Sequence, residues 1–172
     1  MKKSVLFRTV CIALTVIMAA FMFAACGSGG SGGENNTKEV KGETKTWGRY
    51  TILVPEKMEL SGGNVLDPED PTVVTVRDTD SVLHYVMCTI FPEESCKSSV
   101  EGTKESNSGE DVTIDINGVT WTGTKYTWSG SDGFSMYAQI DGEWVLASGF
   151  YHAYDSEITR AILGSIKISA AE

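Results

Sequence analysis

Histidine and cysteine, the side chains that most often serve as bases, nucleophiles and metal ligands, are scarce in this 172-residue chain. It contains two histidines, His84 and His152, and four cysteines. His84 and Cys88 would share one face of a strand, but four strand residues separate them by about 13 Å, which excludes a direct thiol–imidazole pair. We expect His84 to pack at the end of a sheet rather than to bind a metal ion. The sequence therefore predicts no catalytic residue, no metal site and no cofactor.

Carboxylates are more numerous, and they are concentrated in loops and turns. The acidic segment 67–70, with Asp78 and Asp80 nearby, could supply oxygen ligands to calcium. It lacks the regular ligand spacing of a calcium loop, so we interpret it as a solvated loop stiffened by proline. An enzyme that uses two carboxylates needs both acids in one cleft, and we keep such an enzyme as an alternative function.

Cys88 and Cys96 are separated by a short segment that contains Pro92. Outside the cytoplasm a pair of this kind can oxidise to a disulfide. The alternative is two free thiols, one of them packed in the core as a small hydrophobic side chain. Spacing alone does not establish disulfide geometry, so both alternatives stay open.

Aromatic residues gather in one part of the sequence. Nine of the 16 fall within a stretch of 34 residues: Trp121, Tyr126, Trp128, Phe134, Tyr137, Trp144, Phe150, Tyr151 and Tyr154. A sheet core accounts for those that alternate with other apolar residues, such as Phe134 with Met136. Tyr137 has the opposite parity to Phe134 and therefore lies on the other face of its strand.

The second face of this sheet is either buried or exposed. A layer of helix could bury its aromatic rings, as in most two-layer domains. The alternative is an exposed platform that binds a glycan or a peptide, formed by Tyr126, Trp128 and Tyr137, because flat rings bury area at little entropic cost. Trp121 and Trp128 face opposite ways unless Gly123 forms a bulge, which would place them on one face.

Strand patterns dominate the chain after residue 47. Residues 50–54 alternate and stop at Pro55, as an edge strand would, and further strands are expected at 72–76 and 84–91. Residues 112–150 contain four alternating segments, and their turn signals predict an antiparallel meander. These signals are Asn117-Gly118, Asp132-Gly133 and Asp141-Gly142.

Two helices complete the expected α+β architecture. The polar segment 95–106 favours a short helix followed by a loop. Near the end, Asp155 is a good N-cap, apolar residues recur at helical spacing, and Gly164 ends the helix before a short strand at 166–168. Helices packed on an antiparallel sheet define the α+β class.

The N-terminus has the pattern of an exported protein. Basic Lys2, Lys3 and Arg8 precede an apolar run over 10–25, and the run ends in Phe-Ala-Ala before Cys26. This ending resembles the lipobox of bacterial lipoproteins, although Phe stands where an aliphatic residue is usual. The resemblance implies diacylglycerol on the Cys26 thiol, cleavage before this residue, and stable anchoring at the extracytoplasmic face of the cell membrane. An uncleaved anchor and a secreted soluble protein are the alternatives.

The expected organisation is a signal peptide at 1–25, a flexible Gly/Ser-rich and polar tether at 26–46, and one domain at 47–172. The whole chain has 14 basic and 23 acidic residues. Removing the three basic residues of the signal peptide leaves 11 against 23, a net charge of −12. Such a charge repels nucleic acid, so we expect no nucleic-acid partner.

The order of elements resembles a known domain type. The opening strand 50–55, the Asn-Gly hairpin and the closing sequence 162–168 are similar to small Firmicutes lipoproteins with PsbP-like domains. The resemblance implies a sandwich around a central antiparallel sheet and a non-catalytic accessory or binding role, and it transfers no functional residue. The leading hypothesis is therefore a membrane-anchored binding or accessory module of the cell envelope, with a protein, peptide or glycan ligand. A purely structural envelope protein is a further alternative.

Overall fold

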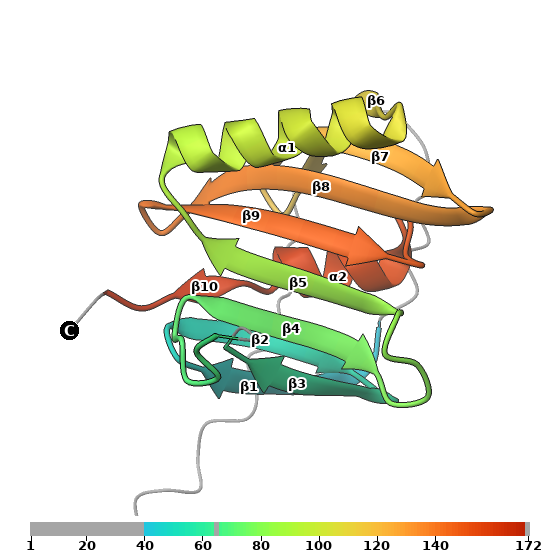
Figure 1. Cartoon of the computed structure of the whole chain (residues 1–172). Coiled ribbons are helices and arrows are strands. Elements are labelled where there is room, and N and C mark those ends of the chain that lie inside the picture. The colour runs from blue at the N-terminus through green and yellow to red at the C-terminus, as the bar shows by residue number, and fades with distance from the viewer. Residues whose placement is uncertain (1–39, 64–65, 171–172) are drawn as a thin grey trace, which may run out of the picture. The chain divides into compact units, whose positions relative to one another are not determined.

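A seven-stranded antiparallel sheet is the largest element of the fold (Figure 1). The computed structural model describes residues 40–63 and 66–170, which belong to one compact unit. The large sheet has the order β3-β4-β5-β9-β8-β7-β6, and a small sheet has the order β1-β2-β10. The elements are β1 (Gly42–Trp47), β2 (Tyr50–Pro55), β3 (Met58–Gly62), β4 (Val73–Asp78), β5 (Tyr85–Ile90), α1 (Glu93–Asn107), β6 (Glu110–Ile116), β7 (Val119–Trp128), β8 (Ser131–Ile140), β9 (Glu143–Phe150), α2 (Glu157–Gly164) and β10 (Lys167–Ile168). The predicted α+β class and the C-terminal helix are confirmed.

Strands β6 to β9 form the predicted meander through three two-residue turns. Asn117-Gly118, Ser129-Gly130 and Asp141-Gly142 each have positive φ at both positions, as the tight hairpin turn requires. The turn predicted at Asp132-Gly133 is wrong, because both residues lie inside β8. Ser129-Gly130 supplies the same left-handed geometry three residues earlier. This register lets Phe134 and its alternate neighbours face the core.

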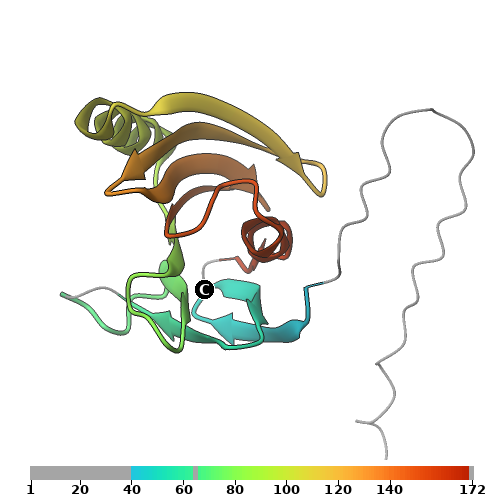
Figure 2. The same ribbon diagram turned by 90° about the vertical axis from the view of Figure 1, so that its right-hand side faces the viewer.

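The two faces of the large sheet are covered differently. Its inner face packs against β2, β10 and α2 around the main hydrophobic core, whose largest fully buried side chains are Trp121, Tyr50, Phe134 and Ile52. Helix α1 packs on the opposite, outer face, over β7, β8 and β9. Figure 2 shows α2 inside the curve of the large sheet and α1 outside it. Neither of the two described helices covers the part of the outer face that belongs to β3, β4 and β5 (Figure 1).

Helix α1 is longer than the short helix expected within 95–106. Its first turn carries Glu93 and Glu94, which favour a helix N-terminus, and Lys97 forms an i,i+4 ion pair with Glu93. Only Cys96 and Val100 are buried. The apolar stripe is therefore too narrow to show as a periodic pattern in the sequence.

The N-cap of α2 is Ser156 rather than the predicted Asp155. The Ser156 hydroxyl accepts a hydrogen bond from the Thr159 backbone N–H at 3.2 Å. The Thr159 hydroxyl in turn donates to the Ala153 carbonyl at 2.8 Å. This pair of bonds fixes the loop that joins β9 to the helix.

Two expectations for the start of the domain are wrong. Strand β2 is not an edge strand, because β1 pairs with one side of it and β10 with the other. Residues 42–46, assigned to the tether, belong to β1, which pairs with β2 from Gly42 to Trp47. Five of the six β1 residues are exposed, so backbone pairing rather than apolar burial holds the strand, and composition did not reveal it. The signal peptide, Cys26 and the tether up to residue 39 lie outside the described residues.

Within the described part of the chain, no helix has the length and apolar character needed to cross a membrane.

Candidate ligand-binding site

Four rings in sequential contact lie at one end of the large sheet, where β7 and β9 end and β5 begins. Trp128 packs on Phe150 with ring centres 5.5 Å apart, and Phe150 meets Tyr151 edge-on at 4.6 Å. Tyr151 stacks on His84 at 4.6 Å. We call Trp128, Phe150, Tyr151 and His84 the aromatic row. The four residues come from three different segments of the chain, so the row depends on tertiary contacts as well as on strand pairing.

Tyr151 has an unusual backbone conformation. Its φ is 60°, in the left-handed region that bulky side chains rarely adopt. A residue held there costs on the order of 1–3 kcal/mol and persists where surrounding contacts impose it, often at functional sites. Here the contacts with Phe150 and His84 offset the cost, and the residue is nevertheless 38% exposed.

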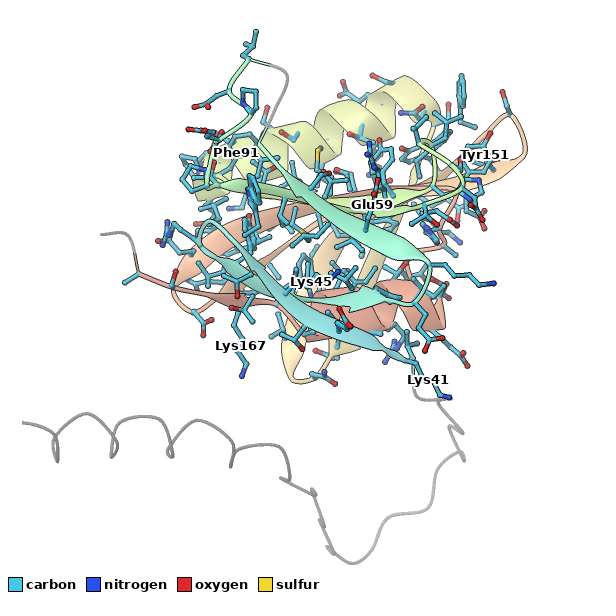
Figure 3. All side chains as sticks on the ribbon, turned by 90° about the horizontal axis from the view of Figure 1, so that it is seen from below. Lys41, Lys45, Glu59, Phe91, Tyr151 and Lys167 are labelled. Carbon is cyan, nitrogen blue, oxygen red and sulfur yellow. The ribbon has the colours of Figure 1, made fainter. Side chains whose placement is uncertain are left out.

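Exposed apolar side chains concentrate at the same end of the sheet. Of the seven large hydrophobic residues exposed among the described residues, four lie here: Val82, Leu83, Trp128 and Tyr151. Trp128 is 55% exposed, and Val82 and Leu83 come from the β4–β5 loop just before His84. Figure 3 places Tyr151 and Phe91, another exposed aromatic residue, at opposite ends of the sheet. Exposed apolar side chains that gather in one region make it a candidate interaction surface.

Tyr126 lies next to the row on the outer face. Its ring covers Gly133 on the neighbouring strand, where an added Cβ would come 2.5 Å from two ring carbons. Gly133 is therefore the residue that lets Tyr126 lie along the sheet toward Phe150, the β9 partner of Gly133. Burial raises the pKa of the Tyr126 hydroxyl, and the neighbouring Tyr85 adds to the shift.

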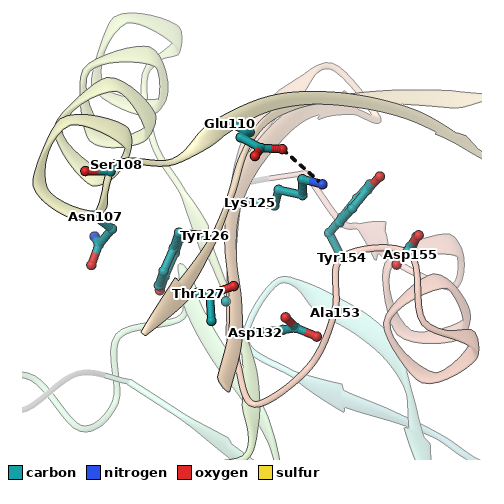
Figure 4. A pocket seen from close by; sticks show the side chains of 11 residues that line it. Asn107, Ser108, Glu110, Lys125, Tyr126, Thr127, Asp132, Ala153, Tyr154 and Asp155 are labelled. Atoms are coloured by element: carbon teal, nitrogen blue, oxygen red, sulfur yellow. Dashed lines mark ion pairs between the residues drawn. The ribbon is translucent and has the colours of Figure 1, made fainter. Parts of the chain in front are cut away.

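A polar hollow of about 550 Å³ adjoins Tyr126 (Figure 4). We call it the end pocket. Its wall includes the end of α1, the ends of β6, β7 and β8 that meet here, and the loop before α2, and its lining residues are Asn107, Ser108, Glu110, Lys125, Tyr126, Thr127, Asp132, Gly133, Ala153, Tyr154 and Asp155. Lys125 Nζ lies 3.2 Å from Glu110 Oε2. This hydrogen bond, followed by the negative charge of the same carboxylate, raises the pKa of Lys125.

The structure brings together two of the three predicted platform residues. Tyr126 and Trp128 lie side by side on the outer face, as alternation along β7 requires. Tyr137 shares that face, but it is half-buried beside α1 and its ring centre lies 5.9 Å from that of Trp144. Its assignment to an exposed platform is wrong, because a helix covers this part of the face.

Gly123 does not form a bulge. The pairing of β7 with β6 and β8 continues through it without a break, so Trp121 and Trp128 face opposite ways. Trp121 is fully buried in the main core, whereas Trp128 joins the aromatic row. A Cβ at Gly123 would overlap the Ser135 backbone, so the glycine serves close strand packing instead.

The disulfide alternative is contradicted, because Cys88 and Cys96 are both free and buried. Cys88 packs in the main core on the inner face, and Cys96 packs beneath α1 on the outer face, so the sheet lies between them. Burial raises the pKa of the Cys88 thiol to about 12 and also raises that of Cys96. Neither thiol has the low pKa of a nucleophile.

The two histidines lie close together beside the row. Their ring centres are 6.2 Å apart, and His84 Nδ1 is 3.9 Å from Asp78 Oδ2. His152 Nε2 is buried and has no hydrogen-bond partner among the described residues. Burial, and then the nearby His84, lower the pKa of His152. In the described ranges, no group of three or more His, Cys, Asp or Glu side chains is arranged to hold a metal ion.

Comparison with known proteins gives only distant structural matches. No protein-family model matches the sequence. No curated protein matches it either. A crystal structure from Bacteroides thetaiotaomicron VPI-5482 is similar at 8% identity with a TM-score of 0.46, over 77% of this chain and 50% of that one. The chain thus spans half the length of that protein. The solution structure of cyanobacterial PsbP (CyanoP) from Synechocystis sp. PCC 6803 is similar at 12% identity with a TM-score of 0.45, over 81% of this chain and 98% of that one.

Proposed function

We propose that this protein is a lipid-anchored, extracytoplasmic binding or accessory module of the cell envelope, and that it holds its ligand on the aromatic row and in the end pocket. The observation that carries the proposal is the row itself, in which Trp128 and Tyr151 remain exposed although Tyr151 is held at positive φ. A packing role alone would favour glycine or asparagine in that conformation.

The chemistry of the row suits binding better than catalysis. Stacked rings present rigid apolar surface that loses little conformational entropy when a ligand covers it. The two cysteine thiols, which are the strongest nucleophiles of the described chain, are buried away from this surface. The ligand would therefore be held and released unchanged.

Capture of envelope material tests this proposal. In non-ionic detergent, which dissolves the membrane and removes the contribution of the lipid anchor, isolated cell-envelope material from the source cell should retain the wild-type protein in a sedimentation assay, and the Trp128→Ala/Tyr151→Ala double variant should lose most of that retention. Phe91→Ala/Leu66→Ala is the matched control, since it also removes two exposed apolar side chains, away from the row. Equal retention of all three proteins would refute a binding role for the row and leave the structural-protein alternative.

The lipid anchor is tested separately. The N-terminal pattern that ends at Cys26 supports lipid attachment to its thiol and an extracytoplasmic location, in line with the resemblance to small lipoproteins that carry PsbP-like domains. Metabolic labelling with radioactive palmitate should label the wild-type protein and the Cys11→Ser control, but not Cys26→Ser. Labelling of Cys26→Ser at the wild-type level would overturn the anchor.

One observation favours the second candidate function, an extracytoplasmic enzyme that uses carboxylates. The end pocket brings Glu110, Asp132 and Asp155 to one hollow. Glu110 is held by Lys125, which leaves Asp132 and Asp155 as the acid pair to test. Envelope polymers incubated with the wild-type protein and with Asp132→Asn/Asp155→Asn distinguish the functions, because only an enzyme releases soluble fragments that the variant does not.

A further inference from the structure

We infer that the ligand of this site is an extended peptide in which basic and apolar residues alternate, bound as an added strand along the open end of β7. The inference rests on the proposed function and specifies its ligand. Three features carry it: an unpaired stretch of strand edge, carboxylates on one side of that edge, and aromatic rings on the other.

The edge of β7 is open over its last three residues. Pairing between β6 and β7 ends at Glu110 and Lys125, whereas pairing between β7 and β8 continues to Trp128 and Ser131. The chain leaves the sheet at this point because Gly109 donates its N–H to the Lys104 carbonyl of α1. Among the strands that the structure describes, residues 126–128 of β7 thus have a neighbour on one side only.

Backbone alternation shows which groups are available on that edge. Two-residue hairpins close on a hydrogen-bonded pair, here Ile116–Val119 for β6–β7 and Trp128–Ser131 for β7–β8. Counting from either pair, odd-numbered residues of β7 direct their N–H and C=O toward the β6 side. The Thr127 backbone therefore points out into the end pocket, and no described residue pairs with it there. An added strand gains main-chain hydrogen bonds from such an edge.

The inner side of the open edge is acidic. By register, Glu110 shares the face of Lys125, and Asp132 shares the face of Thr127. Asp155 joins them from the loop before α2, so three carboxylates and one ammonium line the pocket, a net charge of −2. The ammonium is occupied by Glu110 at 3.2 Å. A basic side chain on the inner face of an added strand would meet unpaired negative charge.

Aromatic rings complete the recognition. Figure 4 shows the rings of Tyr126 and Tyr154 on opposite sides of the pocket, with Lys125 between them and the carboxylates nearby. Tyr154 can face the inward-pointing cation of the ligand through its ring. Tyr126 and Trp128 lie on the outer side of the same edge, where the alternate residues of an added strand would point. An alternating basic and apolar sequence is therefore the pattern that satisfies both sides together.

Titration calorimetry on the full chain in non-ionic detergent at low salt tests the inference. The probes are acetylated, amidated Lys-Val-Lys-Val-Lys, the block isomer Lys-Lys-Lys-Val-Val, and Glu-Val-Glu-Val-Glu. The alternating basic peptide should bind at least about fivefold more tightly than its isomer, because only in the alternating sequence do all three lysines of an added strand point to the acidic inner side. The acidic peptide should not bind. Equal affinity for the two isomers, or binding of the acidic peptide, would overturn the inference.

Variants locate the contact. Asp132→Asn/Asp155→Asn should raise the Kd of the alternating peptide about fivefold, the combined effect of two solvent-accessible charge pairs. Glu69→Gln/Glu94→Gln removes the same charge from the opposite end of the sheet and should change Kd less than about twofold. An unchanged Kd in the pocket variant, or an equal change in the control, would contradict the acidic-pocket assignment.

The backbone contact has its own test. Thr127→Pro removes the outward N–H without removing a β7–β8 hydrogen bond, so it should weaken the alternating peptide about tenfold, while Thr127→Val should not. Binding by Thr127→Pro at the wild-type level would rule out strand addition. Should the proline variant not fold, the peptide isomers and the carboxylate variants still decide. Failure of the proposed function has a different signature, since Trp128→Ala/Tyr151→Ala would then leave envelope capture unchanged.

Discussion

Replacing Gly133 by alanine should displace Tyr126 from the outer face of the sheet. A Cβ at this position would lie 2.5 Å from two carbons of the Tyr126 ring, and about 1 Å more is needed for ordinary contact. The backbone of Gly133 is paired with both neighbouring strands, so the ring is the part that must move. The variant therefore removes an aromatic contact without deleting any side chain.

The size of the effect follows from what Tyr126 buries. A tyrosine buries on the order of 200 Å² when fully enclosed. Tyr126 is half-buried, so displacement exposes about 100 Å², which costs up to about 2.5 kcal/mol. Replacing a strand glycine by alanine offsets about 0.5–1 kcal/mol of this through reduced backbone entropy of the unfolded chain. We expect Gly133→Ala to lower the free energy of unfolding by about 1–2 kcal/mol.

Chemical denaturation of a double-mutant cycle measures the coupling. Gly133→Ala should destabilise the wild-type protein, but in a Tyr126→Ala background it should be neutral or slightly stabilising. Gly102→Ala, in α1 where an added Cβ meets nothing within 4 Å, is the control for a glycine replacement without a clash. An equal loss of stability in both backgrounds would show that Tyr126 is not the obstacle and would refute the reasoning.

Three further predictions concern the cysteines, His152 and the N-cap of α2. The thiols of Cys88 and Cys96 should not react with a thiol reagent at pH 8 until the protein unfolds, since burial raises both pKa values, and fast labelling of the native protein would contradict their placement. The pKa of His152 is lower in the folded protein than in the unfolded chain, where it is about 6.5. Below that pH the unfolded chain binds a proton at His152 more readily than the folded protein does, so the free energy of unfolding falls as the pH falls. Urea denaturation at pH 7.5 and pH 5 should therefore show a stability loss at low pH that is smaller in His152→Phe, and an identical pH dependence would count against this origin. Ser156→Ala should cost about 1 kcal/mol by thermal denaturation and Asp155→Ala much less, and the reverse order would restore Asp155 as the N-cap.

Much of the sheet could be predicted because its signals are local. The Asn117-Gly118 turn and the alternation on either side of it specify two paired strands without any distant contact. Parity along β7 likewise placed Tyr126 and Trp128 on one face. The Ser129-Gly130 turn was missed because Asp132-Gly133 fits the same local geometry, and only pairing with β9 distinguishes the two.

The remaining errors have non-local causes. β1 is polar and exposed, so its strand conformation depends on pairing with β2, which its own sequence does not show. Helix α1 buries just two residues, so its length depends on packing against the sheet beneath it. The position of α1 in turn decides that Tyr137 is covered. The positive φ of Tyr151 could not be predicted, since an aromatic residue after a strand does not by itself indicate a left-handed backbone conformation.

The pairing of β1 also determines how the domain responds to mechanical load. A pull on the chain ahead of residue 40 acts first on the hydrogen bond from the Glu56 N–H to the Lys41 carbonyl, then on the Gly42–Pro55 pair, and the pairs then open one after another toward Trp47. Opening in sequence needs far less force than shearing all six pairs together. Release of the six β1 residues adds about 20 Å of chain while most of the buried core stays closed. β1 is therefore the part of the domain that a pull from its N-terminal side releases first, and its release lengthens the chain before the main core opens.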